Sequence, residues 1–171
     1  MISVRRALNA LVVACLVFIV YVVFTGSISP YDAITGAVAA VVVGLLFSNI
    51  TLSNAKKALD PRRWYHLVIY ALRYFTVDET LAHVDVIKRI LHPKKPVNPA
   101  IVKVPYDVET DYAKTAVACS ITNTPGTVVV EVNEEEKVFY VHWIDAKTLK
   151  PEEAKNYISG VFEKYSKKIF D

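Results

Sequence analysis

Three threonines and a glycine lie close together in the C-terminal half of the sequence, in a stretch with the chemistry to bind an anion. Thr122, Thr124 and Thr127 supply hydroxyl groups, and Gly126 lets backbone N–H groups turn towards a common point. The pattern predicts a helix before this stretch and a strand after it, so no helix N-terminus faces the site. A tight turn and an anion site are both compatible with these residues, and the turn is favoured.

Three other side chains are candidates for a chemical role. His142 stands next to Trp143 in a strand-like pattern, where a sheet or packing residue is favoured over a base or a metal ligand. Arg73 and Asp78 lie in a mostly apolar segment, and ionisable residues at membrane depth indicate a functional site by default. The competing interpretation is that Arg73 anchors to lipid phosphate. No chain of acidic residues or lysines accompanies them, so we do not expect this chain to conduct ions alone.

Signatures of catalysis and of cofactor binding are missing from the sequence. It has no Gly-rich phosphate loop, no HExxH motif and no Ser/His/Asp set in a suggestive context. Cys15 and Cys119 are far apart, neither has a second cysteine at metal spacing, and both are predicted to be small buried side chains. We therefore expect a protein that is not an enzyme, with no catalytic residue, no cofactor, no cofactor-binding residue and no metal ligand.

The elements that must position these side chains divide the chain into two halves of different character. Hydrophobic residues make up 53% of the 171 residues, which is high for a small globular protein. Residues 1–99 contain 11 Lys and Arg against 5 Asp and Glu, whereas residues 100–171 contain 9 against 12. Because no basic face with interleaved aromatic residues is present, nucleic acid is excluded as a partner.

Two apolar runs in the first half predict transmembrane helices at about residues 7–24 and 31–47. The first run has Asn9 as its only strongly polar side chain, and as a helix it measures about 27 Å, close to the thickness of the hydrocarbon core. The basic start at Arg5 and Arg6 also fits a secretory signal. A membrane anchor is favoured because the run is longer than a signal core and a second run follows.

The second run repeats small residues at intervals of four. Gly36, Ala40 and Gly44 fall on one helical face, which lets another helix approach closely, although glycine and alanine are also common in membrane helices generally. If the face is real, we expect it to dock on another membrane subunit.

Positive charges on both sides of the helix pair predict its orientation. Basic residues precede the first helix and follow the second, whereas the link at residues 25–29 is uncharged. The positive-inside rule therefore predicts a multi-pass protein of the cell membrane with both ends, and the C-terminal domain, in the cytoplasm.

Residues 64–92 form a third segment of mixed character. Its first half is mostly apolar, its second half is charged, and polar side chains recur at helical spacing: His66, Arg73, Thr76, Thr80 and His83. The segment is either an amphipathic helix in the membrane interface or a short third membrane helix. A charge at mid-bilayer costs about 2.5 to 3.5 kcal/mol, so the interface is favoured.

Residues 93–171 predict a cytoplasmic α+β domain of β-α-β-β-α order. Alternating patterns predict strands at residues 100–105, 127–132 and 138–144, and helical patterns cover residues 112–121 and 151–170. This order suits a small sheet covered by two helices on one face. The predicted fold is thus a membrane α-helical N-terminal half, residues 1–63 with the third segment, followed by this domain.

Several stretches resemble the E-type subunit family of the multisubunit Na+/H+ antiporters. They are Ser120-Ile-Thr-Asn-Thr-Pro-Gly-Thr127 with the following valine-rich strand, Tyr140-Val-His-Trp-Ile-Asp145, the Gly-Ser-Ile-Ser-Pro link at residues 26–30, and residues 86–93 ahead of residues 101–105. Asn123 stands where the family often has leucine, and Ala100 where glycine is common.

The resemblance implies an accessory subunit of a large membrane assembly in which bigger subunits move the ions. It implies other membrane subunits and the lipid bilayer as partners, and no catalytic residue. Related modules also occur in archaeal membrane-bound hydrogenase and sulfur-reducing complexes, so the host complex stays open. A free-standing, membrane-tethered sensor that binds a small anion at residues 124–127 is the alternative.

Overall fold

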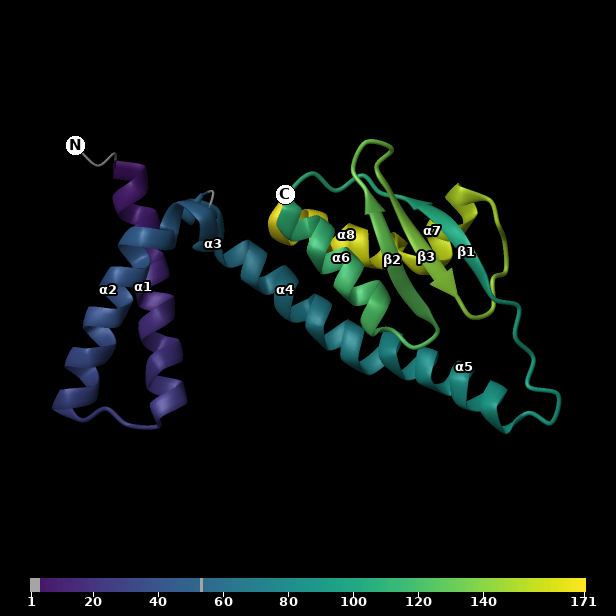
Figure 1. Ribbon diagram of the computed structural model, residues 1–171, viewed down its shortest axis with the longest axis horizontal. Coiled ribbons are helices and arrows are strands. Elements are labelled where there is room, and N and C mark those ends of the chain that lie inside the picture. The colour runs from purple at the N-terminus through teal and green to yellow at the C-terminus, as the bar shows by residue number, and fades with distance from the viewer. Residues whose placement is uncertain (1–3, 53) are drawn as a thin grey trace. The chain divides into compact units, whose positions relative to one another are not determined.

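A computed structural model describes residues 4–52 and 54–171 (Figure 1). The chain forms two compact units, Met1–Asp60 and Pro61–Asp171, and each is described by itself. The second unit therefore takes in the segment of mixed character together with the sheet, where the sequence suggested separate segments at residues 64–92 and 93–171.

The first unit is a hairpin of two long helices, α1 (Val4–Thr25) and α2 (Pro30–Thr51), followed by a short helix, α3 (Ala55–Ala58). Both long helices are long and apolar enough to cross a membrane. They extend beyond the predicted ranges mainly because polar residues continue them: Arg5 and Arg6 at the start of α1, and Ser48, Asn49 and Thr51 at the end of α2. Ser29 caps α2 by accepting a hydrogen bond from Asp32 N, with Pro30 in the first turn.

The small-residue face of α2 packs against α1. Gly36, Ala40, Gly44 and Ser48 are the buried residues of α2. A Cβ atom at position 44 would lie 2.6 Å from the carbonyl oxygen of Ala10, and one at position 36 would lie 2.6 Å from the Tyr21 ring. The predicted packing face is therefore real. The prediction that it docks on another subunit is wrong, because the chain's own first helix occupies it.

Asn9 closes the end of the hairpin where α2 stops. Its Nδ2 donates to the carbonyl oxygen of Leu52 at 2.7 Å, and its Oδ1 accepts from the N–H of Ala55 at 3.0 Å. The side chain is only 4% exposed. One amide thus satisfies a carbonyl after α2 and the N–H that begins α3, two backbone groups that a helix end leaves without partners.

We expect Asn9→Leu to lower the stability of the hairpin by about 1 to 3 kcal/mol, because both backbone groups then lose their partner. The melting temperature of the full chain in mild detergent measures this loss. Asn49→Leu is the matched control, since Asn49 is exposed on α2. Equal melting temperatures for the two variants would contradict the role of Asn9.

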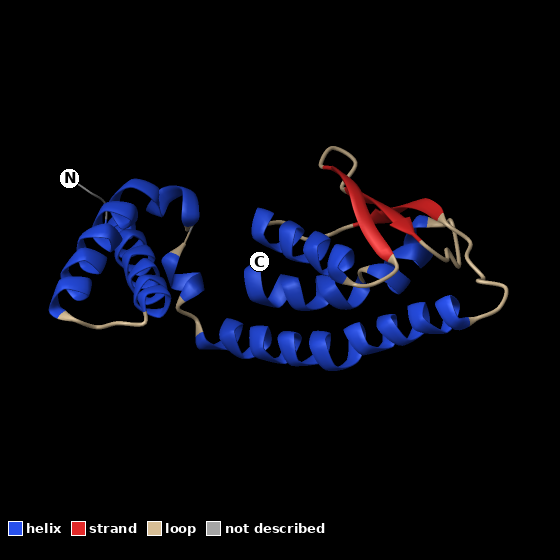
Figure 2. Cartoon of the chain, turned by 60° about the horizontal axis from the view of Figure 1, so that its bottom comes forward, coloured by secondary structure: helices blue, strands red, loops and turns tan. Residues whose placement is uncertain are grey.

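The second unit begins with one continuous helical segment. It consists of α4 (Pro61–Arg73), a π turn η1 (Tyr74–Asp78) and α5 (Glu79–Leu91). Figure 2 shows this segment as a long, gently curved helix beside the rest of the unit. After it come β1 (Ala100–Pro105), α6 (Asp111–Asn123), β2 (Thr127–Asn133), β3 (Val138–Trp143), α7 (Pro151–Ile158) and α8 (Gly160–Phe170). The last helix was predicted as one element and is two.

Ser159 interrupts that last helix. It is fully buried, has φ −117° and ψ −15°, and precedes Gly160, which lowers helix propensity. Its hydroxyl lies 3.1 Å from a carboxylate oxygen of Glu163, so the break is stabilised from inside the core.

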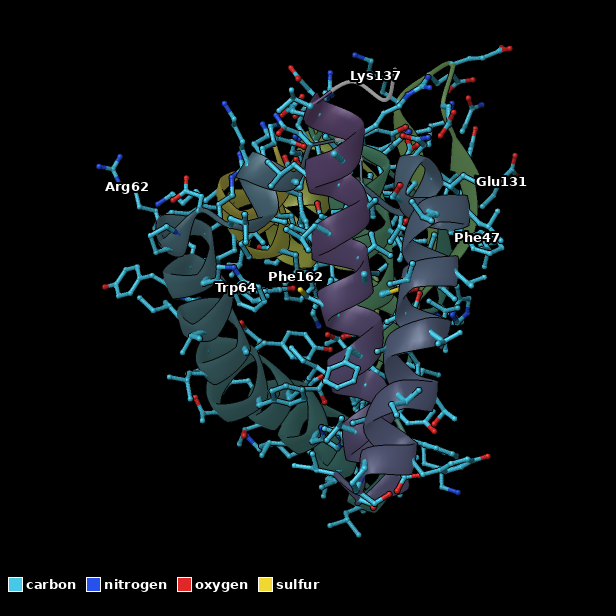
Figure 3. The ribbon with its side chains drawn as sticks, turned by 90° about the vertical axis from the view of Figure 1, so that its left-hand side faces the viewer. Phe47, Arg62, Trp64, Glu131, Lys137 and Phe162 are labelled. Carbon is cyan, nitrogen blue, oxygen red and sulfur yellow. The ribbon has the colours of Figure 1, made fainter. Side chains whose placement is uncertain are left out.

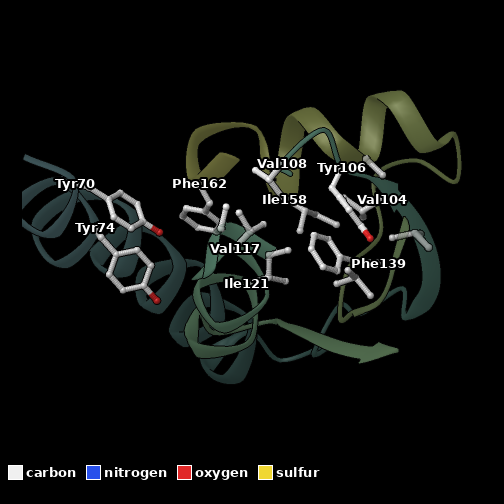
Figure 4. Packing of buried hydrophobic residues seen from close by; sticks show 14 of the residues in the cluster. Tyr70, Tyr74, Val104, Tyr106, Val108, Val117, Ile121, Phe139, Ile158 and Phe162 are labelled. Atoms are coloured by element: carbon white, nitrogen blue, oxygen red, sulfur yellow. The ribbon is translucent and has the colours of Figure 1, made fainter. Parts of the chain in front are cut away.

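The sheet has three antiparallel strands in the order β1-β3-β2. One face of the sheet is buried, and its inward side chains alternate along two of the strands: Val102 and Val104 on β1, Phe139 and Val141 on β3. Helices α6, α7 and α8 supply the other half of the core, in place of the two helices predicted (Figure 4). Tyr70 and Tyr74 of the long helical segment join the same cluster.

Candidate functional site

The threonine-rich stretch builds the connection between α6 and β2. Thr124 Oγ1 donates to the carbonyl oxygen of Ser120 at 2.8 Å, and Thr127 Oγ1 donates to that of Ile121 at 2.7 Å. Thr122 Oγ1 accepts from Val129 N at 3.2 Å. Gly126 adopts φ +99°, in the region that favours glycine. The predicted turn is present, and its hydroxyl groups are engaged with the chain's own backbone.

The N-terminal part of this stretch also holds the long helical segment. Tyr74 Oη donates to Glu79 Oε1 at 2.6 Å and accepts from Asn123 Nδ2 at 3.0 Å. The hydroxyl of Tyr70 is hydrogen-bonded to that of Ser120. Figure 4 shows the two tyrosine rings side by side next to Phe162. We call Tyr70, Tyr74, Glu79, Ser120 and Asn123 the tyrosine clasp.

The π turn lies where the helical segment contributes Tyr74 and Glu79 to the clasp. Glu79 N donates to the carbonyl oxygen of Tyr74, five residues earlier, so this turn holds one residue more than an α-helical turn. Arg73 and Asp78 are the ionisable pair singled out in the sequence. Arg73 precedes the turn, Asp78 is its last residue, and the two side chains lie 3.4 Å apart (Nε to Oδ2). They belong to the second unit and not to the two long apolar helices, and they pair with each other.

Two arginines fix the ends of the segment. Arg63 Nη1 donates to the carbonyl oxygen of Ile169 at 2.7 Å, at the end of α8. Arg89 Nη2 lies 2.8 Å from Asp145 Oδ2, just after β3, while its Nη1 donates to the carbonyl oxygen of Pro96 at 3.0 Å. Lys147 and Arg89 beside Asp145 lower the pKa of its carboxyl group. Together with the clasp, these contacts attach the segment at its start, middle and end.

The structure shows where the other residues singled out in the sequence lie. His142 lies on β3 between Ile101 and Val128 of the neighbouring strands. Cys15 on α1 is exposed, and so is Cys119 on α6, so the prediction that both are buried side chains is wrong. The buried face of that helix follows Ala113, Val117 and Ile121 at intervals of four, which leaves position 119 outside it. Within residues 4–52 and 54–171, no group of His, Cys, Asp and Glu is arranged to hold a metal ion.

Sequence reasoning missed Asn9 and both tyrosines of the clasp. A signal was available for the tyrosines. Tyr70 and Tyr74 are four residues apart on an apolar helical stretch, and a buried phenol requires a hydrogen-bond partner. For Asn9 the signal was its isolation as the single amide in an apolar run.

Comparison with known proteins decides the family. A family model described as Na+/H+ ion antiporter subunit matches residues 14–169. The chain belongs to this family. Among its members, the E-type Na+/H+ antiporter subunit of Alkalihalophilus pseudofirmus is 31% identical over 127 residues, which is 74% of this chain and 77% of that protein. The E1-type subunit of Staphylococcus haemolyticus is 29% identical, with 78% and 80% covered. The resemblance to the E-type subunits is thereby confirmed.

A solved structure resembles nearly the whole chain. A chain of the archaeal membrane-bound sulfane sulfur reductase, a respiratory membrane complex, superposes with a TM-score of 0.82 and 31% identity. The match covers 95% of this chain and 99% of that one. The family's fold thus includes both the apolar hairpin and the sheet with its helices, and the protein is a membrane protein.

Burial of Tyr70 in the clasp makes the stability of the second unit depend on pH. It raises the pKa of Tyr70 to about 12, so the neutral phenol is the form that the folded unit favours. Because the pKa of an unfolded tyrosine is about 10, this stabilisation is complete below about pH 10 and is lost as the pH rises to about 12. We expect the second unit to unfold in this alkaline window. The fluorescence of Trp143, measured in a Trp64→Phe background, reports the unfolding.

Tyr70→Phe removes the ionisable group, so its loss of stability between pH 10 and 12 should be smaller than that of the parent chain. Tyr157→Phe is the control, because the Tyr157 side chain is 67% exposed. If Tyr70→Phe and Tyr157→Phe lose stability with the same pH dependence, Tyr70 does not carry the transition.

Proposed function

We propose that this chain is an accessory, assembly-type subunit of a multisubunit Na+/H+ antiporter module, anchored in the cell membrane and without catalytic activity of its own. Family membership over residues 14–169 is the observation that carries the proposal. Its partners are other membrane subunits and the lipid bilayer. The similar chain from the sulfane sulfur reductase supports respiratory membrane complexes as further hosts.

Ion translocation belongs to other subunits in this proposal. The charged residues of α1 and α2 are Arg5, Arg6 and Asp32, and each occupies one of the first three positions of its helix. Neither helix therefore brings an Asp, Glu, His, Lys or Arg side chain to its middle, where a relay for Na+ or H+ needs one. The exposed apolar sides of the hairpin suit contacts with lipid or with other membrane helices.

The C-terminal unit faces the cytoplasm in this proposal. The support is the distribution of basic residues: Arg5 and Arg6 precede the hairpin, and four basic residues lie between positions 56 and 63. The anion-sensor alternative is not supported, since the relatives are antiporter subunits and the threonine hydroxyls of the turn are engaged internally.

Affinity purification from native membranes in mild detergent tests the proposal. The tagged chain should bring down a set of multi-helix membrane proteins that mass spectrometry identifies, and any reductase or hydrogenase proteins among them name the host. Recovery of the folded chain alone would count against the subunit assignment.

A further inference from the structure

The long helical segment of the second unit carries an uncovered apolar side. Eleven of its large apolar side chains are exposed, with exposures between 40% and 76%, and all of them except Val77 and Leu81 are grouped here. We call them the outer face: Trp64, Tyr65, Val68, Leu72, Phe75, Val84, Ile87, Ile90 and Leu91. So much exposed apolar surface on one element indicates an interaction site.

The opposite side of the segment is already occupied. Tyr70 and Tyr74 are buried in the core cluster, and Arg63 and Arg89 bind the ends of the segment to α8 and to the end of β3. The outer face is therefore the side that the unit itself leaves uncovered. Figure 3 shows Arg62 and Trp64 on α4, with the Arg62 side chain projecting away from the helix.

The charge of the segment identifies what covers this face. Residues 61–95 contain seven Lys and Arg against three Asp and Glu, a net charge of +4. Residues 96–171, which form the rest of the unit, contain nine against twelve, a net charge of −3. Five of the seven basic residues lie in the segment itself, residues 61–91, and Lys94 and Lys95 lie in the turn that follows it. Basic charge is thus concentrated on the helical segment and the turn at its end. An apolar helical side rich in aromatic residues and accompanied by lysine and arginine matches an anionic lipid surface.

The chain connection keeps the segment near a bilayer. Only residues 52–60 separate the end of α2 from the start of α4, and a connection of that length spans at most about 30 Å. Because α2 is a membrane helix, the first turns of α4 are tethered within reach of the lipid headgroups.

We propose that the outer face docks on the anionic lipid surface, with α4, η1 and α5 lying flat along the bilayer and the clasp holding the sheet domain on top. The proposal rests on the membrane anchoring in the proposed function. A spanning orientation would pull Tyr70 and Tyr74 out of the core. It would also place the Arg73–Asp78 pair in hydrocarbon, where each charge costs about 2.5 to 3.5 kcal/mol. Lying flat preserves every contact described for the segment.

Tryptophan quenching by brominated lipids tests the docking. The full chain is reconstituted in vesicles of phosphatidylcholine and phosphatidylglycerol whose acyl chains carry bromine either near the headgroups or near the bilayer centre. Phe75→Trp and Ile87→Trp are made separately in a Trp64→Phe, Trp143→Phe background and report on the middle and the far end of the outer face. Trp64→Phe alone leaves Trp143 of β3 as the matched control and as a reporter of the folded unit.

Both introduced tryptophans should lose fluorescence to the shallow bromines more than to the deep ones and should be shielded from aqueous iodide. Trp143 should keep its fluorescence with either lipid. Replacing phosphatidylglycerol by phosphatidylcholine should weaken the quenching at position 87, because the basic charge then loses its attraction.

Other outcomes overturn the proposal. Stronger quenching of Phe75→Trp by the deep bromines would mean that the segment spans the bilayer. No quenching at positions 75 and 87 would mean that the outer face does not contact the bilayer. Equal quenching with and without phosphatidylglycerol would mean that anionic lipid does not attract the segment. The assignment as a subunit is judged separately by co-purification, so a chain that assembles without being quenched refutes the docking alone.

Discussion

Replacing Gly44 by leucine is expected to separate the two membrane helices and to abolish recovery of the chain with its partner subunits. Even a Cβ atom at this position would lie 2.6 Å from the Ala10 carbonyl oxygen and 3.0 Å from the Ala14 Cβ, and neither neighbour is the far end of a flexible side chain. Overpacking of this kind costs about 1 to 3 kcal/mol in a well-packed core and more where backbone must shift.

Two measurements separate the causes of that loss. The melting temperature of the purified chain in detergent reports on the hairpin itself, and co-purification reports on assembly. Ala37→Leu is the matched control, because Ala37 lies on the exposed side of the same helix. Loss of assembly with an unchanged melting temperature would show that position 44 contacts another subunit directly, contrary to the packing described above.

The second large effect is expected for Tyr74→Ala. Removing a buried aromatic side chain costs about 3 to 5 kcal/mol, and Glu79 and Asn123 also lose their shared hydrogen-bond partner. We expect the helical segment to detach from the unit, so that amide hydrogens of α6 and α8 exchange faster while those of the α1–α2 hairpin keep their rates.

Phe75→Ala is the control for that variant. The residue is adjacent and similar in size, but its side chain is 68% exposed. In detergent it should leave the stability of the second unit within about 0.5 kcal/mol of the parent, as surface substitutions usually do. Equal destabilisation by the two variants would mean that the clasp does not hold the segment.

Local pattern was enough to predict the sheet elements. Strand β1 has the predicted bounds, residues 100–105, because alternating side chains on a half-buried strand leave a period of two in the sequence. The strand order β1-β3-β2 could not be predicted, because the sequence of a strand does not indicate which other strand it pairs with. The same holds for the π turn, which forms where the helix meets Ser120 and Asn123, more than forty residues away.

Charge and hydropathy predicted the membrane helices but not what their faces contact. The repeat of Gly36, Ala40 and Gly44 reveals a close-packing face without naming the helix that packs there. Asn123 illustrates a similar limit. It stands where the family often has leucine, and that difference alone does not reveal that its amide donates to Tyr74.

The order of the strands has a consequence for how the protein is made. The central strand of the sheet, β3, is the last of the three to leave the ribosome, so β1 and β2 both wait for residues 138–143 before they can pair. The hairpin needs only residues up to Ala55 and can be complete much earlier. During synthesis the helical segment therefore emerges with its tyrosines uncovered beside a finished membrane anchor. A stalled or shortened chain would expose both apolar sides of that helix at once.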